Sequence, residues 1–88
     1  MKDVWMVKYG EHTIRVVNTW THEKLFVDGA LQDEQVGLHC ASRLFGKVKN
    51  TSGEYEEIKI STGVRFFNKH CRIFVGNELI YTTETQPS

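Results

Sequence analysis

The chain has 88 residues, which is room for one domain with one modest hydrophobic core. Apolar residues make up 40% of it, and its aromatic residues are five Phe, three Tyr and two Trp, which excludes a disordered chain. The 11 Lys and Arg residues balance 11 Asp and Glu residues, so no net charge attracts nucleic acid or an anionic membrane. We therefore expect no nucleic-acid partner and no membrane association.

Targeting signals are absent from the pattern of the sequence. The opening Met1-Lys2-Asp3-Val4-Trp5 lacks the continuous apolar stretch of a signal peptide, and no segment approaches the roughly 18 apolar residues of a membrane span. We expect a cytoplasmic protein whose two cysteines stay reduced, because domains stapled for secretion usually carry more of them. We place a single all-β domain at residues 1–82 and a flexible polar tail at residues 83–88.

Short runs of β-branched and aromatic residues, separated by Gly, Asn and Asp, predict strands and turns throughout the chain. In the first half, residues 4–9 and 13–19 form a hairpin around Gly10-Glu11. The clearest hairpin signal is Asp28-Gly29 between residues 25–27 and 30–32, because this dipeptide tolerates the positive φ angles of a type I′ turn. That register puts Phe26 on the same side as Leu31.

The second half follows the same pattern after a connection at residues 36–42. Residues 43–49 alternate between apolar and basic side chains, and Asn50-Thr51-Ser52-Gly53 reverses the chain into residues 54–61. The adjacent Glu56-Glu57 breaks the alternation, which is typical of a bulge. The remaining expected strands are residues 64–68, 71–75 and 78–83, with a turn at Gly76-Asn77.

An internal repeat is visible in this pattern. Residues 14–18 resemble residues 64–68, and residues 25–31 resemble residues 73–79. A strand-plus-hairpin unit used twice predicts two sheets packed face to face; the alternative is that hairpins of similar composition look alike. We predict a small antiparallel β-sandwich or flattened barrel of about seven to nine short strands. The expected core is Trp5, Val7, Ile14, Val16, Phe26, Leu31, Leu44, Ile58, Ile60, Phe74 and Leu79.

Four sequence blocks resemble one known family. They are Trp5-x-Val7, His12-x-Ile14-x-Val16, Lys24-x-x-Val27-Asp28-Gly29 and Leu44-x-Gly46-Lys47, and with their spacing they resemble the domain of the Fas apoptosis inhibitory molecule family. The resemblance implies a compact antiparallel β-sandwich that acts in the cytosol through contacts with other proteins and has no catalytic site. The chain departs from the family at Val75-Gly76-Asn77-Glu78, where the family favours an Asn-Gly type of turn.

Two His-Cys dipeptides, His39-Cys40 and His70-Cys71, are the candidates for thiol or metal chemistry, since zinc takes both ligand types and a Cys-His pair activates a thiol. Adjacent residues on a strand point to opposite faces and do not reach one ion, so we expect no metal site and no cofactor. We interpret Cys71 as a small core residue. A thiol- or metal-dependent activity at these pairs remains the alternative to a non-catalytic domain.

Trp20, between Thr19 and Thr21, is the most informative aromatic residue. An indole in a loop either plugs one end of the core or anchors a partner. The candidate binding site is therefore Trp20 with Thr19, Thr21 and His22. We expect the chain to be a protein-interaction module that is not an enzyme. We expect this site to bind another protein or a second copy of the chain, as a weak homodimer.

Basic residues recur along the second half of the chain, with Phe and Leu between them. They are Arg43, Lys47, Lys49, Arg65, Lys69 and Arg72. Because acidic residues lie near them in the sequence, we interpret them as part of an ordinary mixed surface rather than as a nucleic-acid groove.

Overall fold

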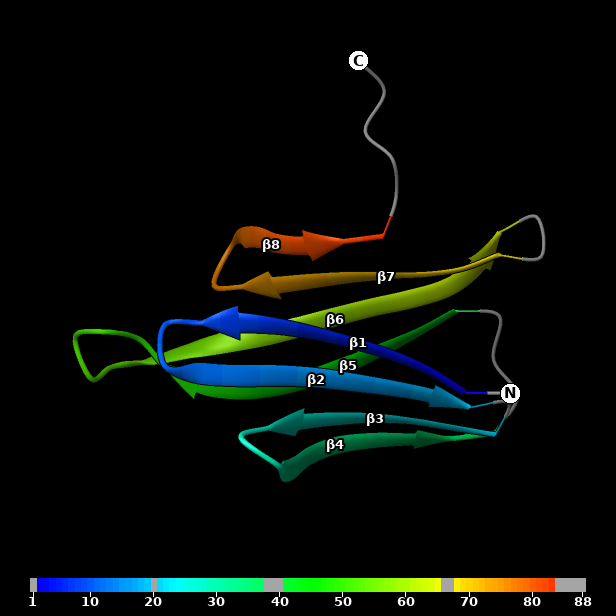
Figure 1. Cartoon of the computed structure of the whole chain (residues 1–88), viewed down its shortest axis with the longest axis horizontal. Helices are drawn as coiled ribbons and strands as arrows, with labels where there is room; N and C mark the ends of the chain where they lie inside the picture. The colour runs from blue at the N-terminus through cyan, green and yellow to red at the C-terminus, as the bar shows by residue number, and fades with distance from the viewer. Residues whose placement is uncertain (1, 20, 38–40, 66–67, 84–88) are drawn as a thin grey trace, which may run out of the picture.

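The computed structural model describes residues 2–19, 21–37, 41–65 and 68–83, which form eight β-strands (Figure 1). Within each half of the chain the strands pair in chain order, so that two four-stranded antiparallel sheets result. Sheet A contains β1 (Lys2–Tyr9), β2 (His12–Thr19), β3 (His22–Val27) and β4 (Ala30–Val36). Sheet B contains β5 (Ala41–Lys49), β6 (Tyr55–Arg65), β7 (Asn68–Val75) and β8 (Glu78–Thr82). The all-β class is confirmed, and the arrangement is that of a small β-sandwich.

The two sheets form layers that enclose one apolar core. Figure 1 shows β1 and β2 in front of β5 and β6, and the backbone measures 40 × 35 × 16 Å. Each fully buried aliphatic side chain contributes about 1.5–3 kcal/mol by leaving water. Sheet A supplies Ile14, Val16, Leu25 and Val27 to the core, and sheet B supplies Leu44, Val48, Ile58, Ile60, Cys71, Ile73 and Val75.

Strands β4 and β5 close one side of the sandwich through side chains. The amide of Phe45 donates a hydrogen bond to Asp33 Oδ2 at 2.9 Å, and the amide of Lys47 donates one to Gln32 Oε1 at 3.1 Å. Between them, Gly46 lies so close to the layer of sheet A that a Cβ atom there would lie 2.9 Å from Leu25 Cδ2. These contacts cover the outer edge of β5, which would otherwise be exposed because β5 is the edge strand of sheet B.

The type I′ turn expected at Asp28-Gly29 is confirmed. Both residues have positive φ angles, 52° and 84°, and Val27 pairs with Ala30 across the two-residue loop. The Asp28 carboxylate also contacts the neighbouring hairpin, where Oδ1 accepts a hydrogen bond from the Thr13 amide at 2.9 Å and Oδ2 lies 2.6 Å from His12 Nδ1. These two contacts, the imidazole first, lower the pKa of Asp28 below its ordinary value.

Two expectations about the strands of sheet B were wrong. Strand β6 continues through Thr62 and Gly63 to Arg65 instead of ending before a separate strand at residues 64–68. Gly63 pairs with Ala41 on one side and with His70 on the other, so ladder pairing on both edges keeps the strand continuous. The expected bulge at Glu56-Glu57 is also absent, since both residues keep their register with β5.

The core differs from the predicted one in its large side chains. Leu31 and Leu79 are 53% and 40% exposed, and Phe26 and Phe74 are half-buried on the outer faces of the sheets. Leu25, Val27, Ile73 and Val75 fill the core instead. The pairing of Phe26 with Leu31 was predicted correctly, but the side of the sheet was wrong, because periodicity defines two faces without saying which one is buried.

The internal repeat is confirmed for the hairpins β3–β4 and β7–β8. It is wrong for the strand that precedes each of these hairpins. Register shifts fall at Leu25/Phe26 and at Ile73/Phe74, which are equivalent places in the two units. Ile14 pairs with Val27 as Ile58 pairs with Val75, so the structural counterpart of Ile14 is Ile58. Of the matched residues, Val64 and Arg65 end β6 and Asn68 begins β7.

The described part of the chain ends just beyond β8. Thr83 donates its amide to the Cys71 carbonyl at 3.1 Å, and its hydroxyl accepts a hydrogen bond from the Cys71 amide at 2.9 Å. No helix in the described ranges is long and apolar enough to cross a membrane.

Candidate functional site

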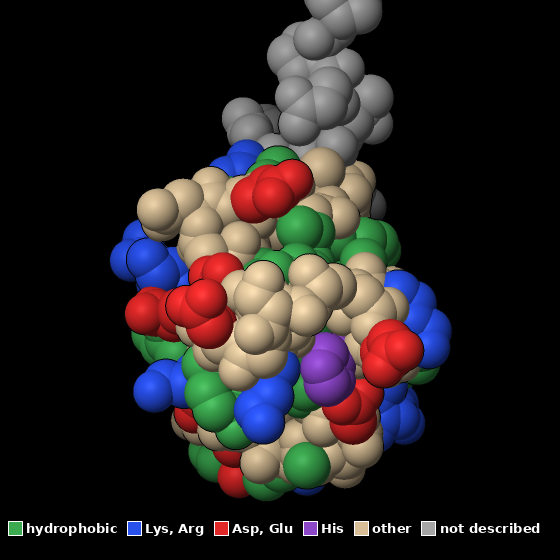
Figure 2. All heavy atoms as spheres, turned by 90° about the vertical axis from the view of Figure 1, so that its left-hand side faces the viewer, with side chains coloured by type: hydrophobic (Ala, Val, Ile, Leu, Met, Phe, Trp, Pro, Cys, Tyr) green, Lys and Arg blue, Asp and Glu red, His purple; other side chains and the backbone are tan. Residues whose placement is uncertain are grey.

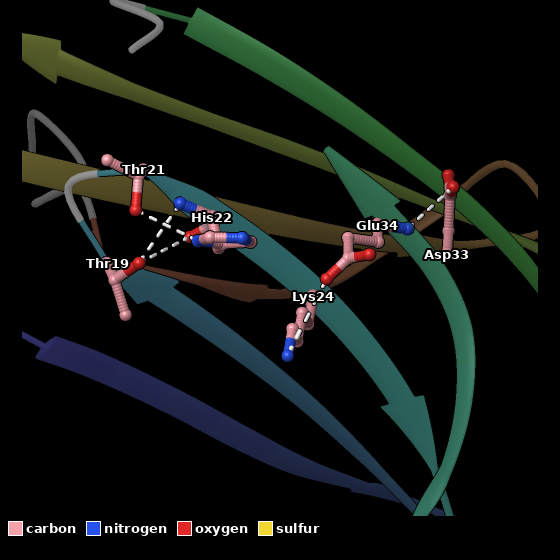
Figure 3. A network of polar contacts seen from close by, with 6 residues as sticks. All are labelled: Thr19, Thr21, His22, Lys24, Asp33 and Glu34. Carbon is pink, nitrogen blue, oxygen red and sulfur yellow. Dashed lines mark hydrogen bonds and ion pairs between the residues drawn. The ribbon is translucent and has the colours of Figure 1, made fainter. Parts of the chain in front are cut away.

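The site predicted around Trp20 lies at the turn between β2 and β3 (Figure 3). Thr19 Oγ1 accepts a hydrogen bond from the His22 amide at 3.0 Å and donates to the His22 carbonyl at 3.2 Å. Thr21 Oγ1 lies 2.9 Å from His22 Nδ1. Trp20 itself lies outside the described residues. The structure therefore brings the three polar members of the predicted site together, and their hydrogen bonds to one another stabilise the turn.

Next to this turn, β3 and β4 carry a charged pair on the outer face of sheet A (Figure 3). Lys24 Nζ lies 3.6 Å from Glu34 Oε2, and Asp33 Oδ1 accepts a hydrogen bond from the Glu34 amide at 2.8 Å. Both side chains of the ion pair are partly exposed, so water screens their attraction. The ion pair links β3 with β4, and the hydrogen bond to Asp33 stays within β4.

The second His-Cys pair has its two side chains on opposite faces of β7, as strand geometry requires. Cys71 is fully buried in the core, and this burial, with the charge of Glu23 second, raises the pKa of the thiol to about 12. Cys71 is a free cysteine in the structure, and at neutral pH it is a protonated core side chain. His39-Cys40 lies outside the described residues. Within the described residues, no group of three or more His, Cys, Asp or Glu side chains is arranged to hold a metal ion.

A polar cluster inside the core was not foreseen from the sequence. Glu23 is 7% exposed, and its Oε1 accepts hydrogen bonds from the side-chain amide of Asn18 and, at 2.6 Å, from the Thr62 hydroxyl. This carboxylate therefore connects β3 of sheet A with β6 of sheet B. Once Ile14 and Val16 fix the buried face of β2, Asn18 falls on that face too, and this alternation was the available signal.

The most distinctive surface is the outer face of sheet B, which we call face B. It is centred on a row of paired residues that crosses all four strands: Phe45, Lys59, Phe74 and Leu79. Phe45 is 50% exposed, and Tyr55 on the same face is 65% exposed. A sheet face that presents apolar side chains in this way is a candidate contact surface.

Basic side chains surround the aromatic rings of face B. Strand β5 points Arg43, Phe45, Lys47 and Lys49 outward in alternation, while Leu44, Gly46 and Val48 point inward. The basic residues on this face are Arg43, Lys47, Lys49, Lys59 and Arg72. The acidic residue among them is Glu57, which pairs with Lys47 across the strands and lies 3.9 Å from Lys59 Nζ. Face B is therefore positively charged although the whole chain is neutral.

Sheet A has a corresponding central row on its outer face, with fewer aromatic rings. Its outer face, called face A, has Met6, Arg15, Phe26 and Leu31 in the positions of Phe45, Lys59, Phe74 and Leu79. The guanidinium of Arg15 lies over the ring of Phe26, 4.6 Å from its centroid. Among the described residues, face A therefore carries one Phe or Tyr ring, Phe26, where face B carries three, and a cation lies over one ring on each face. The two faces form a natural internal comparison.

Several acidic side chains lie elsewhere, at the end of the sandwich formed by the four hairpin turns. Figure 2 looks onto this end and shows acidic side chains spread over it, with Lys and Arg side chains mainly toward the two rims, which are the outer faces of the sheets. Glu11, Asp28, Glu54 and Glu78 lie in or beside these turns. The neutral chain therefore has an acidic end and basic faces.

Of the basic residues noted in the sequence, Arg43, Lys47, Lys49 and Arg72 share face B, whereas Lys69 points toward the interior and pairs with Asp3 at 3.0 Å. Comparison of the chain with protein-family models, curated proteins and solved structures finds no match. The resemblance to the Fas apoptosis inhibitory molecule family therefore rests on the sequence blocks alone.

Proposed function

We propose that this chain is a binding module without a catalytic step of its own, and that face B is its contact surface for a negatively charged partner. The observation that carries the proposal is the combination of exposed rings and basic side chains on this face. Apolar contact supplies affinity, and the surrounding cations select the sign of the partner and speed its approach.

The position of the surface supports this proposal. Because Asp33 and Gln32 cover the edge of β5, a partner is not expected to add a strand there and would meet the flat face instead. The paired strands hold the backbone that carries these side chains, so no backbone ordering is needed when a ligand binds.

The sign of the charge bears on the choice of partner. The weak homodimer expected from the sequence would bring two basic faces together if two copies packed through face B, and like charges in an interface oppose association. A protein partner would accordingly need an acidic contact surface. This restricts the protein-interaction function inferred from the sequence to acidic partners or to other polyanions.

The proposal is tested by titrating the protein with inorganic polyphosphate at low salt and following amide chemical shifts. The expected perturbations cluster on the outward residues of β5–β7, and the double variant Lys47→Gln/Lys49→Gln weakens binding. The matched control Lys2→Gln/Lys8→Gln removes the same charge from face A and should leave affinity within about twofold. Equal losses in the two double variants would show that face B is not the contact surface.

A further inference from the structure

We infer that the ligand of face B is single-stranded nucleic acid, with bases stacked on its rings and phosphates held by its basic side chains. This inference rests on the proposed function and goes beyond it by naming the chemical class of the partner. It also departs from the expectation drawn from the neutral composition, which predicted no nucleic-acid partner.

The rings of face B are placed so that separate bases can use them. Phe45 on β5 and Phe74 on β7 lie in one row with β6 between them, which separates their backbones by about 9–10 Å. Tyr55 stands opposite Lys49, four residues along β6 from the Phe45 row, about 13 Å away along the strand. Stacking of bases on such rings tolerates any sequence, because every base has a flat face.

The cations lie beside the rings rather than in a separate patch. Lys49 Nζ lies 5.3 Å from the centroid of the Tyr55 ring, and Lys59 stands between Phe45 and Phe74 in the central row. A nucleotide carries a flat base and a phosphate within one repeating unit, so adjacent rings and cations match its chemistry. The outward residues of β5 recur about every 6.8 Å, which gives a line of cations along the edge of the face.

A single strand matches this face better than a duplex does. The bases of a duplex are stacked on each other and are reached only through grooves that admit a helix or a narrow ribbon. Face B is a broad sheet surface, and recognition on such a surface uses bases that are unstacked and free to lie on side-chain rings. An acidic protein segment satisfies the cations but has no comparable use for three rings.

The test uses fluorescence anisotropy with the intact chain and a labelled oligothymidylate of about 15 nucleotides. We expect binding whose logarithm falls with the logarithm of salt concentration. Lys47→Gln/Lys49→Gln should flatten that slope by about 1.4, since each phosphate contact to a single strand contributes about 0.7. Lys2→Gln/Lys8→Gln should leave the slope unchanged.

The decisive variant is Phe45→Ala, with Met6→Ala at the equivalent position of face A as its matched control. Both side chains are about half exposed, 50% and 55%, so both variants should fold, which a thermal melt checks. Loss of a stacked base predicts at least about fivefold weaker binding for Phe45→Ala and less than twofold for Met6→Ala.

Four results overturn the inference, and they separate its failure from that of the proposed function. If polyphosphate binds at face B but the oligonucleotide does not, or if Phe45→Ala binds the oligonucleotide as tightly as the unaltered chain, the proposed function stands and this inference fails. If poly-L-glutamate displaces the oligonucleotide at equal charge concentration, the partner is an acidic protein segment. If neither polyphosphate nor oligonucleotide binds, both proposals fail.

Discussion

Replacing Gly46 with Ala tests the close contact between the sheets. The added Cβ would lie 2.9 Å from Leu25 Cδ2 and 3.0 Å from Gln32 Oε1, whereas non-bonded carbon atoms prefer about 3.5–4.0 Å. Leu25 is fully buried, so its side chain cannot move out into solvent. Overpacking of this kind destabilises a domain by about 1–3 kcal/mol, which exceeds the gain of about 0.4–1 kcal/mol expected from a less flexible unfolded chain.

The added methyl group would also displace the Gln32 side chain, which joins β4 to β5. Gln32 Oε1 accepts the Lys47 amide, so moving it weakens a hydrogen bond worth about 0.5–1.5 kcal/mol. Urea unfolding followed by tryptophan fluorescence should therefore show Gly46→Ala to be less stable than the unaltered chain by about 1–3 kcal/mol, with an unchanged slope in denaturant.

A double-mutant cycle identifies the cause of that loss. Leu25→Ala alone should cost about 2–5 kcal/mol, because it leaves a cavity in the core. It also removes the atom that the new methyl group meets, so the double variant should be more stable than the sum of the two losses by at least about 0.5 kcal/mol. If Gly46→Ala keeps the original stability within about 0.5 kcal/mol, or if the two losses simply add, the packing argument is wrong.

Three further predictions concern titratable groups. In a Cys40→Ser background, the Cys71 thiol, with its pKa raised to about 12 by burial, should resist alkylation at pH 8 until denaturant unfolds the chain, and rapid labelling of the folded protein would contradict the core assignment. The pKa of Asp28 is lowered by its imidazole and amide partners, so its contribution to stability is complete above the ordinary value of 3.8 and is lost as the pH falls through the lower folded-state pKa. Asp28→Asn should therefore show a weaker loss of melting temperature on acidification, and an unchanged acid profile would exclude this role. Glu23→Ala leaves two buried donors without their acceptor and should cost about 2 kcal/mol or more, with Glu23→Gln milder because it keeps the accepting oxygen; equal losses in calorimetry would count against the hydrogen-bond account.

Much of the strand pattern could be predicted from local signals. Asp28-Gly29 predicts its own turn, because few other residue pairs adopt two positive φ angles. The alternation from Arg43 to Lys49 likewise predicts both the strand and its two faces. The break expected at Thr62-Gly63 was wrong because a glycine paired on both sides is held in the sheet by hydrogen bonds that no local signal reveals.

The candidate site was harder to predict. Thr19, Thr21 and His22 do lie together, but the structure shows them stabilising a turn. Face B draws on four strands whose order the sequence leaves open, so Phe45 and Phe74 come to lie in one row only through pairing between strands. Residues distant in the chain form a surface only when the register is known.

The sequence by itself determined the all-β class, the tight turns and the repeated hairpin, because each depends on φ preferences and period-two alternation within a few residues. Tertiary structure alone decided which face of the strands around Phe26 and Phe74 is buried: register shifts at Leu25/Phe26 and Ile73/Phe74 accompany a core of aliphatic side chains with these phenylalanines outside. It also decided the charge pattern. Net charge is a sum over the chain, whereas the field that a partner meets depends on where each charge stands, and the fold gathers acids at the turns and cations on the sheet faces.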